Sequence, residues 1–327
     1  MVLLIISFST LAVGFLARPL GGIIFGHFGD RIGRKRTLVV ALMMMGVATT
    51  LIGFLPTYAS IGIAAPLLLV ALRFIQGLAI GGQWGGAMLL VTESAPSDQR
   101  VWYGAYAQAG APMGVILANL AFIGVSSSMS DEAFMDWGWR LPFIASIVLI
   151  GISMYIQLKI EDTEAFRSLS DAQSADDKPA AAVERSPVIE AIRKYPKRIM
   201  LAAGAFLSVQ VTFYILIAFV IAYGMNSPSV ELSRDTMLTA VLVAAAIMVP
   251  TQFYFSGLSD RVGRKNVYRW GAILTGIWGF ILFPLIDTGD PMMIGFAITM
   301  GLLFLGMQYG PQAAYFTELF STEVRYS

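Results

Sequence analysis

One arginine, Arg73, stands in the middle of a long apolar run and is the residue of this chain best placed to do chemistry. It lies about eleven residues into the run at 62–92, roughly 16 Å from its start at the rise of a helix. If the run crosses a membrane, a charge at that depth is costly and marks a site by default. A guanidinium there can bind a substrate carboxylate through two parallel hydrogen bonds. Neutralisation of Arg73 by an acid from another span is the alternative, and it stays open.

Further residues follow Arg73 at helical spacing and give the predicted helix two distinct faces. At 100° per residue, three side chains fall on or beside the face of Arg73: Gln76, Gln83 and Trp84. The adjacent face carries glycine at every fourth position: Gly77, Gly81 and Gly85. Small residues at this spacing let two helix backbones approach closely. The pattern predicts a helix with a polar face toward a cavity and a glycine face toward a neighbouring helix.

Other apolar runs contain amides and tyrosines that could contribute to the same cavity. These secondary cavity candidates are Tyr106, Gln108, Asn119, Gln210, Tyr214, Gln252, Gln308 and Tyr309. A hydrogen bond between two helices is the competing explanation for each of them. No Asp or Glu occurs in the middle of an apolar run, so these residues alone identify no proton carrier.

The composition requires an all-α membrane protein. Apolar residues make up 57% of the 327 residues and charged residues only 13%, which is too few for the surface of a soluble domain. The nearly uncharged runs are long enough for helices that cross about 30 Å of hydrocarbon. Nine spans are predicted: 4–26, 37–56, 62–92, 101–125, 138–159, 199–224, 235–257, 267–287 and 291–316.

The same composition argues against several other classes of protein. The chain has no cysteine, one histidine (His27) and a net charge of +1, so we expect no metal site, no cofactor and no nucleic-acid partner. No nucleotide-binding loop or nucleophile–base constellation is present, so an enzyme is not expected.

Charge divides the connections between spans into two sets. One set, which includes the long segment 161–198, holds 18 of the 22 Lys and Arg residues. Basic loops stay in the cytoplasm, so this set and the central loop are predicted to be cytoplasmic.

The two halves of the chain share a repeated loop. The stretch 25–35 recurs at 255–265 with the common pattern Asp-Arg-x-Gly-Arg-Lys, and Glu93 and Arg100 recur as Glu318 and Arg325. Glycine permits a tight turn, and a carboxylate beside an arginine can latch two helix ends in one conformation. Simple interfacial anchoring is the alternative. The predicted gating residues are Gly26, Asp30, Arg31, Gly33, Arg34, Glu93, Arg100, Asp260, Arg261, Gly263, Arg264, Glu318 and Arg325.

The repeat, the long central loop and several specific runs resemble the major facilitator superfamily. The runs 14–31, 73–87, 137–142 and 318–327 resemble its metabolite–proton symporter branch in particular. The resemblance implies two pseudo-symmetric halves, residues 1–160 and 199–327, joined by the central loop at 161–198. It also implies twelve spans in the family, so about nine are expected here, with the first and the last two absent. Many members carry glutamate where this chain has Gln83.

The resemblance implies a secondary active transporter in the plasma (inner) membrane. The expected activity is movement of a small organic acid or zwitterionic metabolite by alternating access, coupled to protons, in a monomer. Two alternatives stay open: a sugar or drug facilitator of another branch, and a degenerate fragment that transports nothing.

Overall fold

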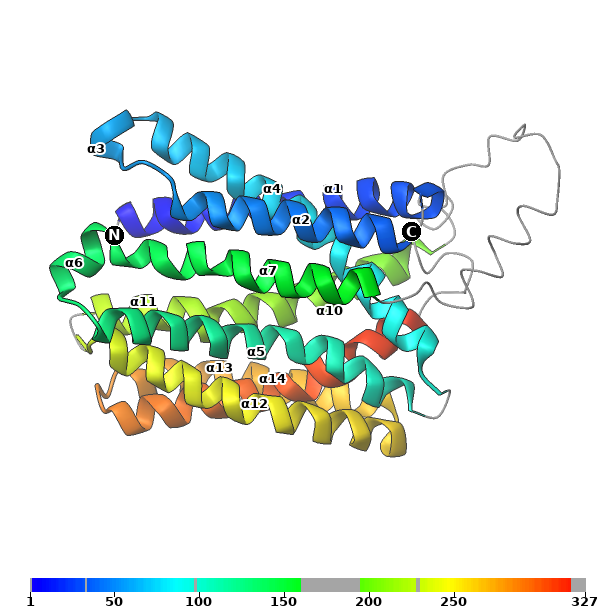
Figure 1. Cartoon of the computed structure of the whole chain (residues 1–327). Coiled ribbons are helices and arrows are strands. Elements are labelled where there is room, and N and C mark those ends of the chain that lie inside the picture. The colour runs from blue at the N-terminus through cyan, green and yellow to red at the C-terminus, as the bar shows by residue number, and fades with distance from the viewer. Residues whose placement is uncertain (1, 33, 97–98, 160–194, 228–229, 319–327) are drawn as a thin grey trace. The chain divides into compact units, whose positions relative to one another are not determined.

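The computed structural model of the chain describes residues 2–32, 34–96, 99–159, 195–227 and 230–318 (Figure 1). These residues form helices and connecting turns, and no strand occurs among them. Most of the predicted central loop, together with Gly33 and Arg325, lies outside the described residues.

The helices follow the apolar runs of the sequence closely. In chain order they are α1 (Val2–Ile32), α2 (Arg34–Gly53), α3 (Tyr58–Ile61), α4 (Ala64–Ser94), α5 (Arg100–Ser127), α6 (Asp131–Asp136), η1 (Gly138–Arg140), α7 (Leu141–Lys159), α10 (Pro196–Tyr214), η2 (Ile215–Phe219), α11 (Val220–Asn226), α12 (Arg234–Val262), α13 (Arg264–Ile286) and α14 (Pro291–Glu318). In the described part of the chain, 8 helical stretches are long and apolar enough to cross a membrane. The one remaining predicted span, 37–56, coincides with α2, whose apolar part, Thr37–Gly53, is shorter.

The described helices belong to two compact units. Unit 1 comprises Met1–Glu93, Val125–Val188 and Tyr326–Ser327, and unit 2 comprises Ser94–Gly124 and Ile189–Arg325. These units differ from the predicted sequence halves at one element, because most of α5 packs with the C-terminal helices. The halves that the repeat defines stay a prediction.

In unit 1, α2 packs along α7, and α1 crosses α4 at backbone distance. A Cβ atom added at Gly77 would collide with the carbonyl oxygen of Gly14, and one added at Gly81 would collide with that of Arg18. From the other side, a Cβ at Gly21 would collide with the carbonyl of Leu78. The predicted packing role of the glycine face of α4 is therefore confirmed for Gly77 and Gly81, and the neighbouring helix is α1.

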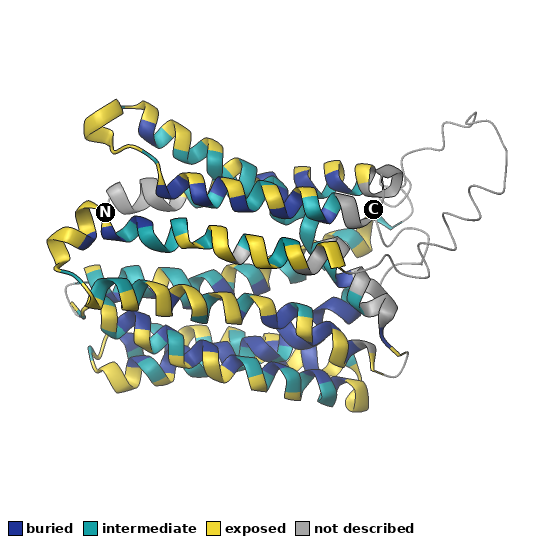
Figure 2. Cartoon of the chain, viewed as in Figure 1, coloured by how far each residue is buried: buried dark blue, intermediate teal, exposed yellow. Residues whose placement is uncertain are grey.

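Unit 2 contains the most continuous core of the described chain. α14 packs along both α12 and α13, and half of its apolar window, Pro291–Phe316, is buried (Figure 2). Met237, Met248 and Ile298 are fully buried in this core, and Val115 and Ile116 of α5 pack against it. Between α10 and α11 the helix passes through a π-helical turn, η2. Such turns insert one residue into a helix and occur often at functional sites.

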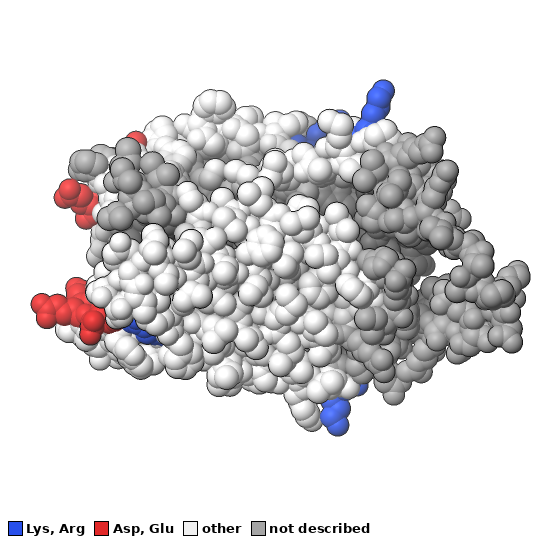
Figure 3. All heavy atoms as spheres, turned by 90° about the horizontal axis from the view of Figure 1, so that it is seen from above, with Lys and Arg blue, Asp and Glu red and all other residues white. Residues whose placement is uncertain are grey.

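Most of the described charged residues lie near the ends of helices, with Arg73 in the middle of α4 as an exception, and the middle of the face seen in Figure 3 shows no charged side chain. In unit 2, Asp287 and Asp290 follow α13 at one end, and Arg261, Arg264 and Lys265 lie at the other. The turn between α12 and α13 is made by Gly263, whose φ of 92° suits glycine. The tight turn predicted for the repeated loop is confirmed at this copy.

Candidate functional site

Arg73 heads a chain of hydrogen bonds in unit 1. It lies one residue from the middle of the apolar window Ala64–Trp84 of α4 and is half-buried. Its Nη1 donates to Gln76 Oε1 at 3.3 Å, and Gln76 Nε2 donates to Thr49 Oγ1 of α2 at 2.7 Å. The Thr49 hydroxyl in turn donates to the carbonyl oxygen of Met45 at 2.7 Å. The Thr49 hydroxyl donates its proton to Met45 and therefore accepts from the Gln76 nitrogen. The amide oxygen of Gln76 is in consequence directed at the guanidinium of Arg73.

Only two of the side chains on the predicted polar face of α4 are joined by a hydrogen bond that the structure describes. Arg73 and Gln76 are joined, as their spacing of three residues predicts. Gln83 and Trp84 lie two turns further along α4 and are half-buried. Thr49 was not expected from the sequence. A hydroxyl inside a predicted span was its only signal, and nothing in the sequence shows which helix faces Gln76.

In unit 2, three buried glutamines join α5 to α12 and α14. Gln108 Nε2 donates to the carbonyl oxygen of Tyr309 at 3.1 Å and to Gln312 Oε1 at 3.3 Å. Gln252 Nε2 donates to the carbonyl oxygen of Ala105 at 3.0 Å. The exposed fractions of Gln108, Gln252 and Gln312 are 2%, 0% and 1%. We call these three residues the amide cluster.

The amide cluster leaves two polar atoms unmatched. Gln252 Oε1 and Gln312 Nε2 are buried and have no hydrogen-bond partner, and the same holds for Asn119 Nδ2 three turns along α5 from Gln108. A hydrogen bond between membrane helices stabilises by about 0.6 kcal/mol on average, so the three bonds of the cluster contribute about 2 kcal/mol. An unsatisfied buried polar group costs about 1–3 kcal/mol. The favourable and unfavourable contributions are thus of the same order.

The other predicted candidates of unit 2 fall into different environments. The ring of Tyr309 is stacked on Phe213, with centroids 5.6 Å apart, and Phe213 meets Tyr214 edge-on. Tyr106 is 58% exposed and lies against Phe253. Gln210 is half-buried on α10. The structure thus brings Gln108 and Tyr309 together and leaves Tyr106 at the surface of its unit.

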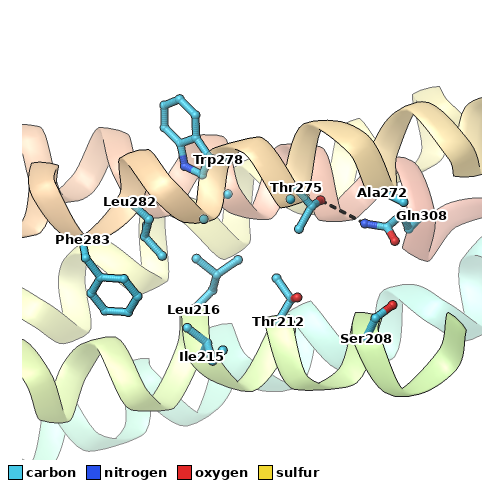
Figure 4. A pocket seen from close by; sticks show the side chains of 13 residues that line it. Ser208, Thr212, Ile215, Leu216, Ala272, Thr275, Trp278, Leu282, Phe283 and Gln308 are labelled. Carbon is cyan, nitrogen blue, oxygen red and sulfur yellow. Dashed lines mark hydrogen bonds between the residues drawn. The ribbon is translucent and has the colours of Figure 1, made fainter. Parts of the chain in front are cut away.

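Gln308 faces a cavity of about 270 Å³ between α10, α13 and α14 (Figure 4). Its Nε2 donates to Thr275 Oγ1 at 2.9 Å. Ser208 and Thr212 add hydroxyls. The rest of the lining is mainly apolar and includes Ile215, Leu216, Leu282 and Phe283. The described lining carries no charged side chain, so this cavity offers a carboxylate no counter-charge.

Only part of the predicted gating set can be located. Asp260 Oδ1 lies 3.8 Å from Arg264 Nη2, one turn along the second copy of the repeated loop. Gly26 is half-buried in α1, and Arg261 is exposed. The side chains of Asp30, Arg31, Arg34, Glu93, Arg100 and Glu318 are outside what the structure describes. The ion pair is local to its loop, so the latch between halves stays a prediction.

Among the described residues, no group of three or more His, Cys, Asp or Glu side chains could hold a metal ion. Apart from the ion pair of Asp260 with Arg264, the polar side chains described above carry amides, hydroxyls and the guanidinium of Arg73. Such groups bind and orient a ligand through hydrogen bonds and charge.

Comparison with known proteins gives consistent matches over almost the whole chain. The Major Facilitator Superfamily model matches residues 4–326. The inner membrane metabolite transport protein YhjE of Escherichia coli is 39% identical over 329 residues, covering 98% of this chain and 72% of that protein. The shikimate transporter of the same organism is 39% identical over 322 residues, covering 98% of this chain and 72% of the transporter. The proline/betaine transporter of E. coli is 30% identical over 330 residues, covering 99% of this chain and 65% of that transporter.

Solved structures agree on the fold. The xylose transporter XylE from E. coli, in a partially occluded inward-open conformation, gives a TM-score of 0.68 at 17% identity, covering 96% of this chain and 76% of XylE. At that identity the likeness shows the fold alone. Together with the helical membrane architecture and the family match, these relatives show that the chain is a multi-pass membrane protein that belongs to the Major Facilitator Superfamily.

Proposed function

We propose that this protein is a secondary active transporter that moves a small organic acid or zwitterionic metabolite across the plasma (inner) membrane by alternating access, coupled to proton symport. Membership of a family of metabolite transporters supports the general activity. The single observation that carries the substrate class is Arg73, a guanidinium at the middle of an apolar span with its neighbouring amide held in place.

A carboxylate is the ligand that this arrangement recognises best. Arg73 can present two parallel N–H groups to two carboxylate oxygens, and this geometry is stronger and more selective than a neutral hydrogen bond. The names of two relatives, a shikimate transporter and a proline/betaine transporter, refer to compounds that each carry a carboxylate. A neutral sugar has no carboxylate to accept two charge-assisted hydrogen bonds from Arg73, which disfavours a sugar facilitator.

Proton coupling is proposed from the resemblance to metabolite–proton symporters. Gln83 cannot titrate, and it lies where many members of that branch carry glutamate. A coupling acid therefore has to be sought elsewhere than on the Arg73 face of α4. We also propose that the protein works as a monomer with its basic loops in the cytoplasm.

Uptake into proteoliposomes tests the proposal. The purified chain is reconstituted, and uptake of radiolabelled shikimate, proline, betaine and xylose is measured with and without an inward acid gradient. We expect accumulation of at least one carboxylate compound, increased by the gradient, and none of xylose. Substituting Arg73→Gln should lower uptake at subsaturating substrate by about tenfold or more, because a charge-assisted bidentate contact is lost.

Two matched variants separate charge from geometry. Arg73→Lys keeps the charge but loses the planar fork, so uptake should fall less than in Arg73→Gln. Uptake that is indifferent to both the gradient and Arg73→Gln would refute the proposal. Uptake of xylose in place of the carboxylates would favour the sugar facilitator.

A further inference from the structure

Arg140 is a buried arginine of unit 1 that the proposed function does not yet use. It is the last residue of the short helix η1, it belongs to the run 137–142, and it is only 9% exposed. Within the described part of the chain, its guanidinium makes no ion pair with a carboxylate. A buried charge is costly unless other polar groups compensate it, so the partners of this guanidinium need an explanation.

Two backbone carbonyls and one aromatic ring hold the guanidinium in place. Nη1 donates to the carbonyl oxygen of Asp136 at 2.8 Å, and Nη2 donates to that of Leu55 at 3.2 Å. The Cζ atom lies 4.5 Å from the centre of the Trp139 ring. Asp136 ends α6, and Leu55 follows the last residue of α2 by two positions, so both carbonyls lie where helix C-termini carry partial negative charge. Arg140 therefore ties the end of α2 to the start of α7.

The end of α2 is also in close contact with the start of α7. A Cβ atom added at Gly53 would lie 2.8 Å from Ile144 Cγ1 and 3.2 Å from the carbonyl oxygen of Arg140. About two turns earlier, a Cβ atom at Gly46 would collide with the side chain of Ile150. The position of α2 is therefore set by α7, and Arg140 fixes the end from which the chain continues into α3 (Figure 1).

α2 also carries the hydroxyl that orients the candidate carboxylate site. Thr49 lies one turn before Gly53 and accepts from Gln76 Nε2 at 2.7 Å, and Gln76 Oε1 in turn accepts from Arg73. Any displacement of α2 moves Thr49 with it, and a bond of this length is lost once its atoms move apart by about 1 Å. The orientation of Gln76 beside Arg73 therefore depends on how α2 is held against α7.

We propose that Arg140 is a positioning residue of the carboxylate site, which acts on Gln76 through the position of α2 and does not itself touch the substrate. The inference deepens the proposed function and rests on it, because it takes Arg73 as the group that binds the carboxylate. Since Thr49 makes the described hydrogen bond from α2 to Gln76, the effect of Arg140 on substrate affinity requires Thr49.

The kinetics of uptake into proteoliposomes test the proposal. Arg140→Met keeps a long side chain but removes both bonds to carbonyls, and it should raise KM for the carboxylate compound by about threefold to tenfold. That range corresponds to one hydrogen bond, the bond from Gln76 to Thr49, and the maximal rate should change less. Arg140→Lys keeps the charge but loses the planar fork that reaches two carbonyls, so its KM should be intermediate.

A double-mutant cycle with Thr49→Val separates positioning from general loss of stability. When Thr49→Val is already present, Arg140→Met should change KM by less than about twofold, because the bond that it disturbs is absent. Tyr268→Phe is the matched control, since it removes a bond from a side chain to the backbone carbonyl of Ala205 in unit 2, and KM should stay unchanged.

A second variant carries the test if Arg140→Met does not yield folded protein by size-exclusion chromatography. Gly53→Ala adds one methyl group between α2 and the start of α7 and changes no charge. It should also raise KM, and only when Thr49 is present.

Three results would overturn the inference and leave the proposed function intact. The first is uptake by the parent with KM unchanged in Arg140→Met and Gly53→Ala. The second is a rise in KM of equal size with and without Thr49, and the third is an equal rise in Tyr268→Phe. Absence of carboxylate uptake by the parent would instead overturn the proposed function, and the inference that rests on it.

Discussion

Thr49 determines how Gln76 meets Arg73. An amide can present either its oxygen or its nitrogen, and only the oxygen is useful beside a guanidinium. The bond from Gln76 Nε2 to the Thr49 hydroxyl settles this choice from a neighbouring helix. The geometry of the candidate carboxylate site therefore depends on a residue that does not face the guanidinium.

Replacing Thr49 should weaken substrate binding without removing any charge. Thr49→Val keeps the shape of the side chain and deletes the acceptor, so Gln76 is no longer fixed. We expect KM for uptake to rise by about threefold to tenfold, which corresponds to one hydrogen bond, with the maximal rate changed less. Thr50→Val is the neighbouring control, because the Thr50 hydroxyl lies 3.4 Å from Ser146 of α7 instead. Equal effects of the two substitutions would contradict the role of Thr49.

The sequence predicts pairs within one helix better than pairs between helices. Arg73 and Gln76 share a face by their spacing, and the structure confirms their hydrogen bond. Gln312 lies one turn beyond Gln308, and this spacing was a signal that could have found it. The partner of each side chain on another helix depends on which helices are neighbours, and hydropathy carries no information on that.

At the scale of elements, the crossing of α1 and α4 brings two helix backbones into direct contact. Its glycines meet backbone carbonyls rather than flexible side chains. A carbonyl cannot turn aside as a side chain can, so any added atom has to push the helices apart.

Adding one methyl group at the crossing should destabilise the protein. Gly77→Ala and Gly81→Ala should each lower the free energy of unfolding by about 1–3 kcal/mol through overpacking, measured by unfolding in mixed micelles of a mild detergent and dodecyl sulfate. Gly151→Ala on α7 is the control, because its Cβ would meet nothing within 4 Å. That substitution should stabilise by up to about 1 kcal/mol through helix propensity. A loss of stability in Gly151→Ala similar to that in Gly77→Ala would refute the explanation.

The turn between α12 and α13 leads to a second prediction about the free energy of unfolding. Gly263 has φ 92° and ψ 133°, a conformation that costs a residue with a side chain about 1–3 kcal/mol. Gly263→Ala should lower stability by that amount under the same unfolding conditions. Gly204→Ala within α10 meets open space and should not. Retained stability in Gly263→Ala would mean that the turn has an alternative conformation available.

Helix positions were largely predictable, and local irregularities were not. Apolar runs place nearly every long helix within a few residues, because a membrane span is defined by its length and hydropathy. The predicted span at 199–224 gave no sign of the π-helical turn Ile215–Phe219. The turn depends on packing around it, since the residues Ile-Leu-Ile-Ala-Phe would equally suit an α-helix.

For the whole molecule, the distribution of charge predicts which ends face the cytoplasm. The end of unit 2 with Arg261 and Lys265 is basic, and the end of unit 1 formed by α6 is acidic. Basic loops are retained on the cytoplasmic side during insertion.

Labelling of single cysteines in intact cells tests this orientation. A membrane-impermeant maleimide should react with Ala133→Cys of α6 and should react with Asn266→Cys of α13 only after the cells are opened. Both positions are exposed, and neither substitution changes a charge. The opposite pattern of labelling would invert the predicted topology.

The packing of α5 is the part of the whole molecule that sequence could least predict. The repeat assigns it to residues 1–160, yet in this structure it lies in one compact unit with α12 and α14. Amide–carbonyl bonds such as that of Gln108 with Tyr309 join α5 to these helices, and they are visible only once the helices are placed.

The glycine crossing of α1 and α4 also bears on how this gene can change. Glycine codons share their first two bases, and every single-base change that alters the amino acid introduces a side chain. At Gly21, Gly77 and Gly81 any such side chain would strike a backbone carbonyl of the opposite helix. In a library of random point mutants selected for function, these codons should therefore be depleted of every missense variant, regardless of the chemical class of the replacement. Codons of exposed positions on the same helices, such as Leu67, should tolerate most apolar replacements.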